Sequence, residues 1–469
     1  MTRRQDQGAG AVLLPGFVGT ELPAWLEARL RDGLGGVCLF GENIVSRAQV
    51  RALTDAIRAA NPLALIAIDE EGGDVTRLYY ETGSPYPGNA LLGRIDDLDL
   101  TASVATSVAR ELRAVGVNLN FAPDADINSN PDNPVIGVRS FGTDAESVSA
   151  HVSAWVAAHE AEGVAVSAKH FPGHGDTAQD SHLSLPVVDL PLEALREREL
   201  RPFLAAAQAG ARSIMTSHVL LPQLDPMQPA TFSAAILDGV LRGDLGYEGV
   251  IVSDALDMVG ASGEFGIPAA AVRAIAAGCD LLCIGTRNTD EQLEAIGAAL
   301  DAAIADGTLP QARLDDAIAR DRALAESLAA PTPLGDPVPS FDLDRGIAGF
   351  DIGDDVVLEP GAPILTLETV ANIAIGHAPW GPAAAGAVTT PVFDGDVVSV
   401  VGPLVLVGKD NHRHAWVRDT IDAVRAQNPA VVVVDMGWPS PDRAYADIAT
   451  FGASRFAGEA LLKLLGHRS

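Results

Sequence analysis

The stretch GVAVSAKHFPGHGDTAQDSH, from Gly163 to His182, joins a short apolar run to a long polar segment. Residues 163–168 predict a buried strand, because the run is continuous, apolar and short. Pro172 and Gly173 then exclude regular structure over 169–182. We expect this segment to be a surface loop that leaves a buried strand, a position that often carries functional side chains. A surface loop with incidental histidines is the alternative.

The same alternation of a short apolar run and an amphipathic segment occurs eight times between residues 11 and 329. The apolar runs are 11–17, 36–40, 63–68, 116–121, 163–168, 211–216, 249–253 and 279–284. Segments with helical spacing lie between them, for example 47–60, 100–115, 145–162 and 192–209. Continuous apolar strands between helices are typical of a parallel sheet buried on both faces. Eight such units predict an α/β fold with a (β/α)8 TIM-like barrel, with an open doubly wound sheet as the alternative.

Polar residues follow the ends of these predicted strands, where a barrel places its catalytic groups. They are Glu42, Asn43, Asp69 to Glu71, Asp124, Asp126, Lys169, His170, His218 and Asp254. The opposite ends of the strands carry mostly Gly, Ala and Leu. This segregation favours a barrel with one active face.

A proline-rich stretch separates the predicted barrel from a second unit. We expect a catalytic barrel domain over residues 1–330, a linker over 331–345 and a small C-terminal α/β domain over 346–469. Apolar runs and helical segments support this last domain at 397–407, 414–427, 430–435 and 455–465. No chemical constellation is evident there.

The composition argues against several kinds of partner. The chain has 32 basic and 62 acidic residues, a formal net charge of −30, which disfavours nucleic acid and anionic membranes. Its 3 cysteines lie in apolar runs and fit a reducing compartment. The chain start lacks the apolar core of a signal peptide, and no run reaches membrane-spanning length. We therefore expect a cytoplasmic protein; its oligomeric state is not indicated.

Two groups of residues suit glycosyl transfer. Asp254 ends the apolar run 249–253 and suits a nucleophile that attacks an anomeric carbon, with a helix N-cap as an equal alternative. Asp180 and His182 are two residues apart. A carboxylate beside an imidazole favours its protonated form, so the pair suits a general acid/base. A surface pair without a role is the alternative.

Asp69 and Arg77 lie in a charged segment that follows the third predicted strand. Carboxylates and a guanidinium at a barrel mouth suit recognition of sugar hydroxyls, because both make bidentate hydrogen bonds. An exposed charged turn is the alternative.

A metal site competes with the glycosidase interpretation of the polar loop. Zinc or another divalent ion could be ligated there by His170, His174, Asp176, Asp180 and His182. The first predicted strand lacks the His-x-His pair expected of metal-dependent hydrolases on this fold, so we expect no metal.

Several motifs resemble those of the family 3 glycoside hydrolases. KHFPGHG at 169–175, followed by Asp-Ser-His at 180–182, is similar to the signature of the β-N-acetylglucosaminidase branch. Further similar segments are 68–73, 121–123, 135–141 and 240–254. Together they cover the barrel in order, from about residue 13 to residue 285.

The resemblance implies a retaining glycosidase that releases terminal β-linked N-acetylglucosamine from peptidoglycan fragments or chitooligosaccharides, without a cofactor. It implies that Asp254 is the nucleophile and that His182 is the acid/base, with Asp180 as its partner. The small-molecule glycoside would be held through its hydroxyls by Asp69, Arg77, Arg139, Lys169 and His170.

Two residues depart from the family pattern. Asp74 stands where arginine is common, and Asp124 stands where an apolar residue is usual, so the substrate is less determined than the reaction class. A phosphorylase with the same residues is an alternative, because a neutral His182 repels phosphate less than a carboxylate acid/base does. A sugar-binding barrel without catalysis is a more distant alternative.

Overall fold

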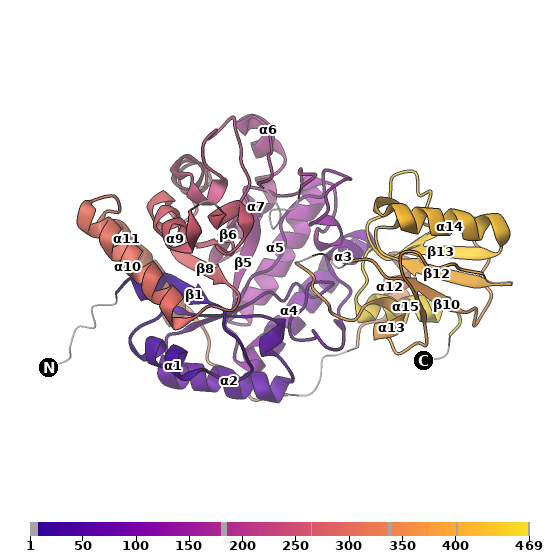
Figure 1. The fold of residues 1–469 in the computed structure, drawn as a ribbon, viewed down its shortest axis with the longest axis horizontal. Helices are drawn as coiled ribbons and strands as arrows, with labels where there is room; N and C mark the ends of the chain where they lie inside the picture. The colour runs from indigo at the N-terminus through magenta and orange to yellow at the C-terminus, as the bar shows by residue number, and fades with distance from the viewer. Residues whose placement is uncertain are drawn as a thin grey trace.

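The computed structural model describes residues 8–179, 185–263, 265–335, 340–370, 372, 374–399 and 402–467. Figure 1 shows a large barrel followed along the chain by a smaller α/β unit. The predicted (β/α)8 barrel with a C-terminal α/β domain is therefore confirmed, in preference to an open doubly wound sheet. The domain boundaries at 330 and 345 stay a prediction; α12 (Leu343–Ala348) begins inside the predicted linker.

Eight parallel strands form the barrel. They are β1 (Leu13–Pro15), β2 (Gly36–Leu39), β3 (Leu65–Ile68), β4 (Leu119–Asn120), β5 (Ala165–Phe171), β6 (Ser213–Thr216), β7 (Val250–Ser253) and β8 (Leu281–Gly285). Their hydrogen-bonded order is β1-β8-β7-β6-β5-β4-β3-β2. Strands β1 and β2, at the two ends of this order, contact each other, so the barrel is nearly closed. Every residue of these strands is buried, which explains the continuous apolar runs.

Helices surround the barrel (Figure 1). They are α1 (Ala24–Arg31), α2 (Arg47–Ala60), α3 (Asn89–Ile95), α4 (Leu98–Val115), α5 (Ala145–Ala161), α6 (Leu192–Glu197), α7 (Arg201–Gln208), α8 (Val259–Ser262), α9 (Gly266–Ala277), α10 (Asp290–Asp306) and α11 (Gln311–Ser327). Side chains fix several helix starts by accepting hydrogen bonds from first-turn N–H groups. These side chains belong to Ser46, Asp97, Asp144 and Thr289.

The structure corrects two expectations in the barrel. The segment 192–209 forms two helices, α6 and α7, and Pro202 stands in the first turn of α7, where its missing N–H costs no hydrogen bond. Lys169 and His170 belong to strand β5 rather than to the loop after it. The strand continues because Lys169 pairs with the chain around Asp124.

The C-terminal unit contains a six-stranded sheet with helices on both faces. In sheet order the strands are β11 (Thr390–Val392), β10 (Ile364–Leu367), β12 (Leu404–Gly408), β13 (Val431–Asp435), β14 (Ile448–Ala449) and β9 (Asp351–Ile352). Only the β14–β9 pair is antiparallel among the described strands. Helix α14 (Ala415–Gln427) covers one face, and α12 and α15 (Arg455–Leu464) cover the other (Figure 1). Among the described residues of the predicted run 397–407, the strand β12 begins after Pro403, which has no N–H to donate.

The two units share an apolar contact. Leu91 and Ile95, on barrel helix α3, pack in the same cluster as Phe350 and Phe456 of the C-terminal unit. Helix α3 lies directly beside α12. The C-terminal unit is therefore docked on the barrel through buried side chains.

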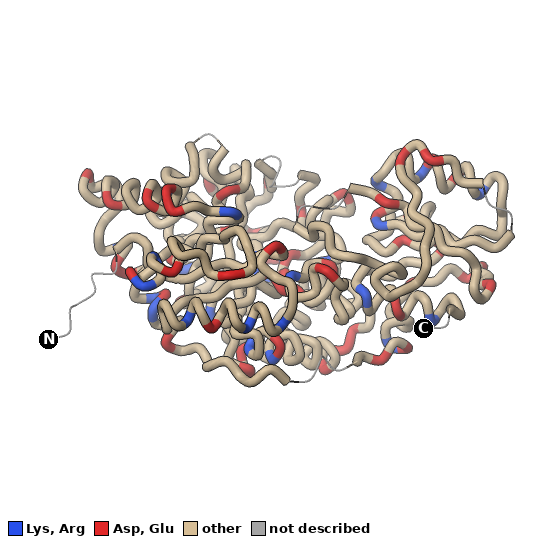
Figure 2. The backbone as a smooth tube through the Cα atoms, turned by 60° about the horizontal axis from the view of Figure 1, so that its bottom comes forward, with Lys and Arg blue, Asp and Glu red and all other residues tan. Residues whose placement is uncertain are grey.

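Acidic residues are spread over both units and outnumber basic ones (Figure 2). Within the described part of the chain, none of the helices combines the length and the apolar character that crossing a bilayer requires.

Candidate active site

A cavity of about 340 Å³ lies at the carboxyl ends of the barrel strands. This volume is at the small end of the range for small-molecule sites. Six of the eight residues predicted from the sequence line the cavity: Asp69, Arg77, Arg139, Lys169, His170 and Asp254. The other two, Asp180 and His182, lie outside the described residues.

Lys169 lies between two carboxylates at the cavity. Its Nζ is 2.7 Å from Asp69 Oδ1 and 2.8 Å from Glu71 Oε1, and its side chain is 2% exposed. Burial opposes the charge of Lys169, but Asp69 and Glu71 raise its pKa overall. Lys169 is therefore a fixed ammonium group, positioned by strand β5 on one side and by its two acidic partners on the other.

Glu71 also binds Arg139. Arg139 donates from Nε and Nη2 to the two oxygens of Glu71, at 3.1 and 2.8 Å. Burial opposes ionisation of Glu71, but Arg139 and Lys169 hold its pKa well below its usual range. One buried carboxylate thus balances two cations of the site, a role that its place in the charged segment did not predict.

The alternation of the charged segment after β3 could have identified Glu71. In an extended chain, residues two apart face the same side, which groups Asp69 with Glu71. Glu70 instead faces away, and its Oε2 accepts hydrogen bonds from Thr76 Oγ1 at 3.0 Å and from Arg77 N at 2.9 Å.

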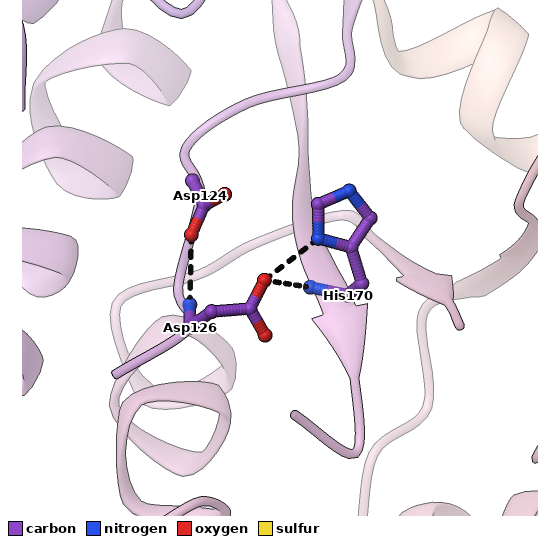
Figure 3. Close-up of side chains that lie close together, drawn as sticks. All are labelled: Asp124, Asp126 and His170. Carbon is purple, nitrogen blue, oxygen red and sulfur yellow. Dashed lines mark hydrogen bonds and ion pairs between the residues drawn. The ribbon is translucent and has the colours of Figure 1, made fainter. Parts of the chain in front are cut away.

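Asp126 holds His170 in place (Figure 3). Asp126 Oδ2 is 2.7 Å from His170 Nδ1, and Asp126 Oδ1 accepts a hydrogen bond of 2.6 Å from His174 N. Burial opposes the charge of Asp126, but His170 and His174 lower its pKa overall. Asp126 therefore orients the imidazole that faces the cavity, although the sequence marked it only as polar.

Asp124, Asp126 and His170 also form a group whose ligand atoms lie within 4.8 Å of one another. Most of the oxygen atoms that could bind a metal already accept hydrogen bonds. Asp124 Oδ1 accepts from Asp126 N at 3.0 Å, and both carboxylate oxygens of Asp126 are bonded to other groups. Asp124 Oδ2 has no hydrogen bond, but Arg139 Nη2 is 3.6 Å away. A metal ion would have to displace these bonds beside an arginine, so the group fits a metal poorly.

Of the five residues of the alternative zinc site, Asp180 and His182 lie outside the described residues, and two of the others are engaged differently. Asp176 forms an ion pair of 2.5 Å with Arg198, and burial lowers the pKa of His174 to about 4.

Asn133 Nδ2 holds the loop by donating to His174 O and Gly175 O, at 2.8 and 2.9 Å. A Cβ at Gly175 would lie 1.7 Å from a backbone oxygen, so this close approach requires glycine.

Asp254 follows strand β7 and is half-buried at the cavity. Its Oδ1 accepts a hydrogen bond of 2.7 Å from Ala255 N, and its own N–H donates to Thr216 Oγ1 at 3.3 Å. No described helix begins after Asp254 until α8, whose N-cap position is Met258. The N-cap alternative for Asp254 is therefore wrong.

Other polar residues after the strands have structural contacts. His218 Nε2 lies 3.0 Å from Ala255 O, next to Asp254 in the chain. Asn43 accepts from Phe40 N at 2.9 Å, and Glu42 pairs with an arginine at 2.8 Å. The position of a polar residue after a strand thus predicts that it lies at the active face. It does not by itself distinguish a substrate-binding residue from one that stabilises the structure.

Asp257 and Ala374 are among the cavity residues that carried no sequence signal. Asp257 lines the cavity and accepts a hydrogen bond of 2.8 Å from Thr286 N. Ala374 also lines the cavity, although it belongs to the C-terminal unit.

Comparison with known proteins gives consistent matches. The profile of the glycosyl hydrolase family 3 N-terminal domain matches residues 21–323. β-Hexosaminidase A of Pseudoalteromonas piscicida is 39% identical over 328 residues, which are 64% of this chain and 55% of that protein. The match thus spans about half the length of this relative. β-Hexosaminidase of Stenotrophomonas maltophilia (strain R551-3) is 38% identical over 316 residues, covering 65% of this chain and 92% of that protein.

Solved structures resemble the whole chain. A glycoside hydrolase family 3 β-N-acetylglucosaminidase from Paenibacillus sp. str. FPU-7 has a TM-score of 0.87 and 30% identity, and the match covers 99% of this chain and 97% of that one. The β-glucoside phosphorylase BglX has a TM-score of 0.78 with 20% identity, covering 100% and 95%. The second likeness concerns the fold alone.

Proposed function

We propose a substrate and a mechanism from one premise: this chain belongs to the family 3 glycoside hydrolases and is a glycosidase. The proposed reaction is removal of a terminal β-linked N-acetylglucosamine with retention of configuration. The observation that carries the proposal is the gathering of Asp254, Lys169, Arg139 and His170 at one cavity. The names of the relatives support the sugar.

In the proposed mechanism, Asp254 attacks the anomeric carbon and forms a glycosyl-enzyme. The hydrogen bond from Ala255 N orients one of its oxygens. His182 protonates the leaving oxygen and then takes a proton from the incoming water, with Asp180 as its partner. Both of these residues lie outside the described part of the chain.

The remaining residues would hold the sugar's hydroxyl groups. Asp69, Lys169 and Arg139 are fixed by one another and by Glu71, and His170 is fixed by Asp126. Donors and acceptors held this way need little reorganisation when the sugar binds. Arg77, which also lines the cavity, would contribute its guanidinium group.

Water is the proposed acceptor, and phosphate is the second candidate. The described cavity lining contains the carboxylates of Asp69, Glu71, Asp254 and Asp257 and the cations of Arg77, Arg139 and Lys169. Lys169 and Arg139 are already paired with carboxylates, so no net positive surface attracts a phosphate ion. The balance of charge therefore favours hydrolysis.

The test is turnover of an aryl β-N-acetylglucosaminide in phosphate and in a non-phosphate buffer of equal ionic strength. Hydrolysis predicts free sugar at similar rates in both buffers. Sugar 1-phosphate as the main product, with a severalfold faster rate in phosphate, would make the enzyme a phosphorylase. Absence of aryl release from any β-glycoside in a panel would leave only the sugar-binding alternative.

The proposal extends to peptidoglycan-derived or chitooligosaccharide fragments as substrates, handled in the cytoplasm. A small cavity suits the terminal sugar of a short fragment. Release of N-acetylglucosamine from purified muropeptides, compared with chitobiose, would distinguish the two sources.

A further inference from the structure

One wall of the cavity comes from the C-terminal unit. Arg77, in the barrel, donates from Nη2 to Ala374 O at 2.9 Å and from Nη1 to Ile375 O at 3.5 Å. Ala374 lines the cavity together with Arg77, although 297 residues separate them in the chain. The guanidinium that was predicted to hold the sugar is thus itself positioned by the second unit.

Two further contacts hold this wall on the barrel. Asn372 Nδ2 donates to Pro134 O at 2.7 Å, and Asn372 Oδ1 accepts from Ala374 N at 2.8 Å. Beyond Ala374, His377 N donates to Tyr80 OH at 3.3 Å. Asn372 is therefore bonded both to the barrel and to the backbone N–H of Ala374.

The barrel loop that receives Asn372 is held from a second point of the C-terminal unit. Arg413 donates to Pro131 O at 2.7 Å and to Asp132 O at 3.0 Å. Val135, three residues after Asp132 in this loop, lines the cavity. The second unit thus contributes Ala374 to the cavity lining and also contacts the barrel loop that carries Val135.

Asp74, one of the two departures from the family pattern, also faces the C-terminal unit. Its Oδ1 accepts a hydrogen bond of 2.8 Å from Ala453 N. Asp74 therefore makes a docking contact between the two units.

We propose that Ala374 is a specificity-determining residue of the substrate site and that Asn372 is a positioning residue, which holds Ala374 against the barrel. The wall limits the size of the sugar substituent that fits beside Arg77. This inference rests on the proposed function, in which the cavity binds the terminal sugar.

The first test enlarges the wall. Ala374→Leu adds carbon atoms at a lining residue, and one methylene too many changes discrimination by about tenfold or more. We expect kcat/KM ratios among aryl β-glycosides of N-acetylglucosamine, N-propionylglucosamine and glucose to change by at least about threefold. Val388→Leu, at a residue of the same unit that is 97% exposed, is the control and should leave them unchanged. Unchanged ratios in Ala374→Leu would overturn the proposal.

The second test separates positioning from stability. Asn428 makes the same pair of bonds as Asn372, from Nδ2 to Gly402 O at 2.7 Å and from Ala430 N to its Oδ1 at 3.1 Å, but wholly within the C-terminal unit. We expect Asn372→Ala to raise KM about 3–10-fold, the worth of one hydrogen bond, with kcat little changed. Asn428→Ala should lower Tm without changing KM. An unchanged KM in Asn372→Ala, or an equal rise in both variants, would contradict the positioning role.

These outcomes are distinct from failure of the proposed function. If Asp254→Asn keeps full turnover, the proposed mechanism fails whatever the wall does. If Asp254→Asn is inactive while Ala374→Leu and Asn372→Ala behave as wild type, only the wall proposal fails.

Discussion

Arg139 and Glu71 form a two-fold hydrogen-bonded ion pair, with side chains 4% and 3% exposed. Lys169 adds a second cation to the same carboxylate. Removing one partner of a buried ion pair destabilises the fold, because the remaining charge stays buried without compensation. With all three side chains present, the charges are balanced within the protein. The sugar-binding face proposed for this cavity therefore depends on a residue that does not itself have to touch the sugar.

We expect Glu71→Gln to lower both stability and activity. Arg139 and Lys169 would lose their shared negative charge, which costs about 3–5 kcal/mol in buried pairs, and kcat/KM should fall roughly 100-fold because two donors shift. Urea unfolding and steady-state kinetics measure the two effects.

Asp280→Asn is the matched control for Glu71→Gln. Asp280 is also buried between two cations, Arg242 at 2.7 Å and Arg313 at 2.5 Å, but it precedes β8 at the other end of the barrel. Its replacement should reduce stability and leave the kinetic constants unchanged. Equal kinetic losses in both variants would show that Glu71 acts only through stability.

Asp254→Asn should keep the fold and lose most turnover, by roughly 1,000-fold or more, because an amide cannot form the glycosyl-enzyme. A 2-fluoro or 5-fluoro glycoside should label the wild type at Asp254, since both chemical steps slow and the ester accumulates. Peptide mapping locates the label. Asp257→Asn, at the neighbouring carboxylate of the cavity, should still be labelled at Asp254; a label on Asp257 would reverse the assignment.

His182→Ala should lose more activity than Asp180→Ala when the leaving group is poor. The aspartate variant keeps an imidazole that is less well oriented and less basic. With an activated aryl leaving group, protonation matters less, so both losses should shrink. Rates across aryl glycosides of graded acidity provide the measurement, and losses independent of the leaving group would exclude His182 as the acid.

Glu70 should make stability depend on pH. Burial raises its pKa from 4.5 to about 7 in the folded protein. The folded state therefore binds this proton more tightly than the unfolded state does. The resulting contribution of Glu70 to the free energy of unfolding is full below about pH 4.5 and is lost as the pH rises through about 7.

We expect the free energy of unfolding of Glu70→Gln to depend less on pH than that of the wild type. At pH 8 it should exceed the wild-type value by up to about 3 kcal/mol. Unfolding free energies from urea titrations at pH 5, 6, 7 and 8 test this. Glu81→Gln, at an exposed glutamate, should follow the wild type throughout. A constant difference between Glu70→Gln and the wild type at all four values would contradict the expectation.

The sequence by itself determined the barrel, because buried parallel strands require apolar runs whose spacing is visible in one dimension. It also placed Asp69, Lys169 and Asp254 at one face, since strand ends of a barrel converge. The motif similar to family 3 enzymes pointed to the reaction class that the comparisons bear out.

Only the tertiary structure decided which polar groups pair with one another. In the sequence, Glu71 is one acid in a charged run, and only the folded structure pairs it with Arg139 and Lys169. The extension of β5 through Lys169 likewise requires the partner segment near Asp124. Ala374 reaches the cavity because helix α3 packs against α12 and docks the C-terminal unit on the barrel. Such a contact depends on the packing of surfaces distant in the chain, and no local pattern of residues encodes it.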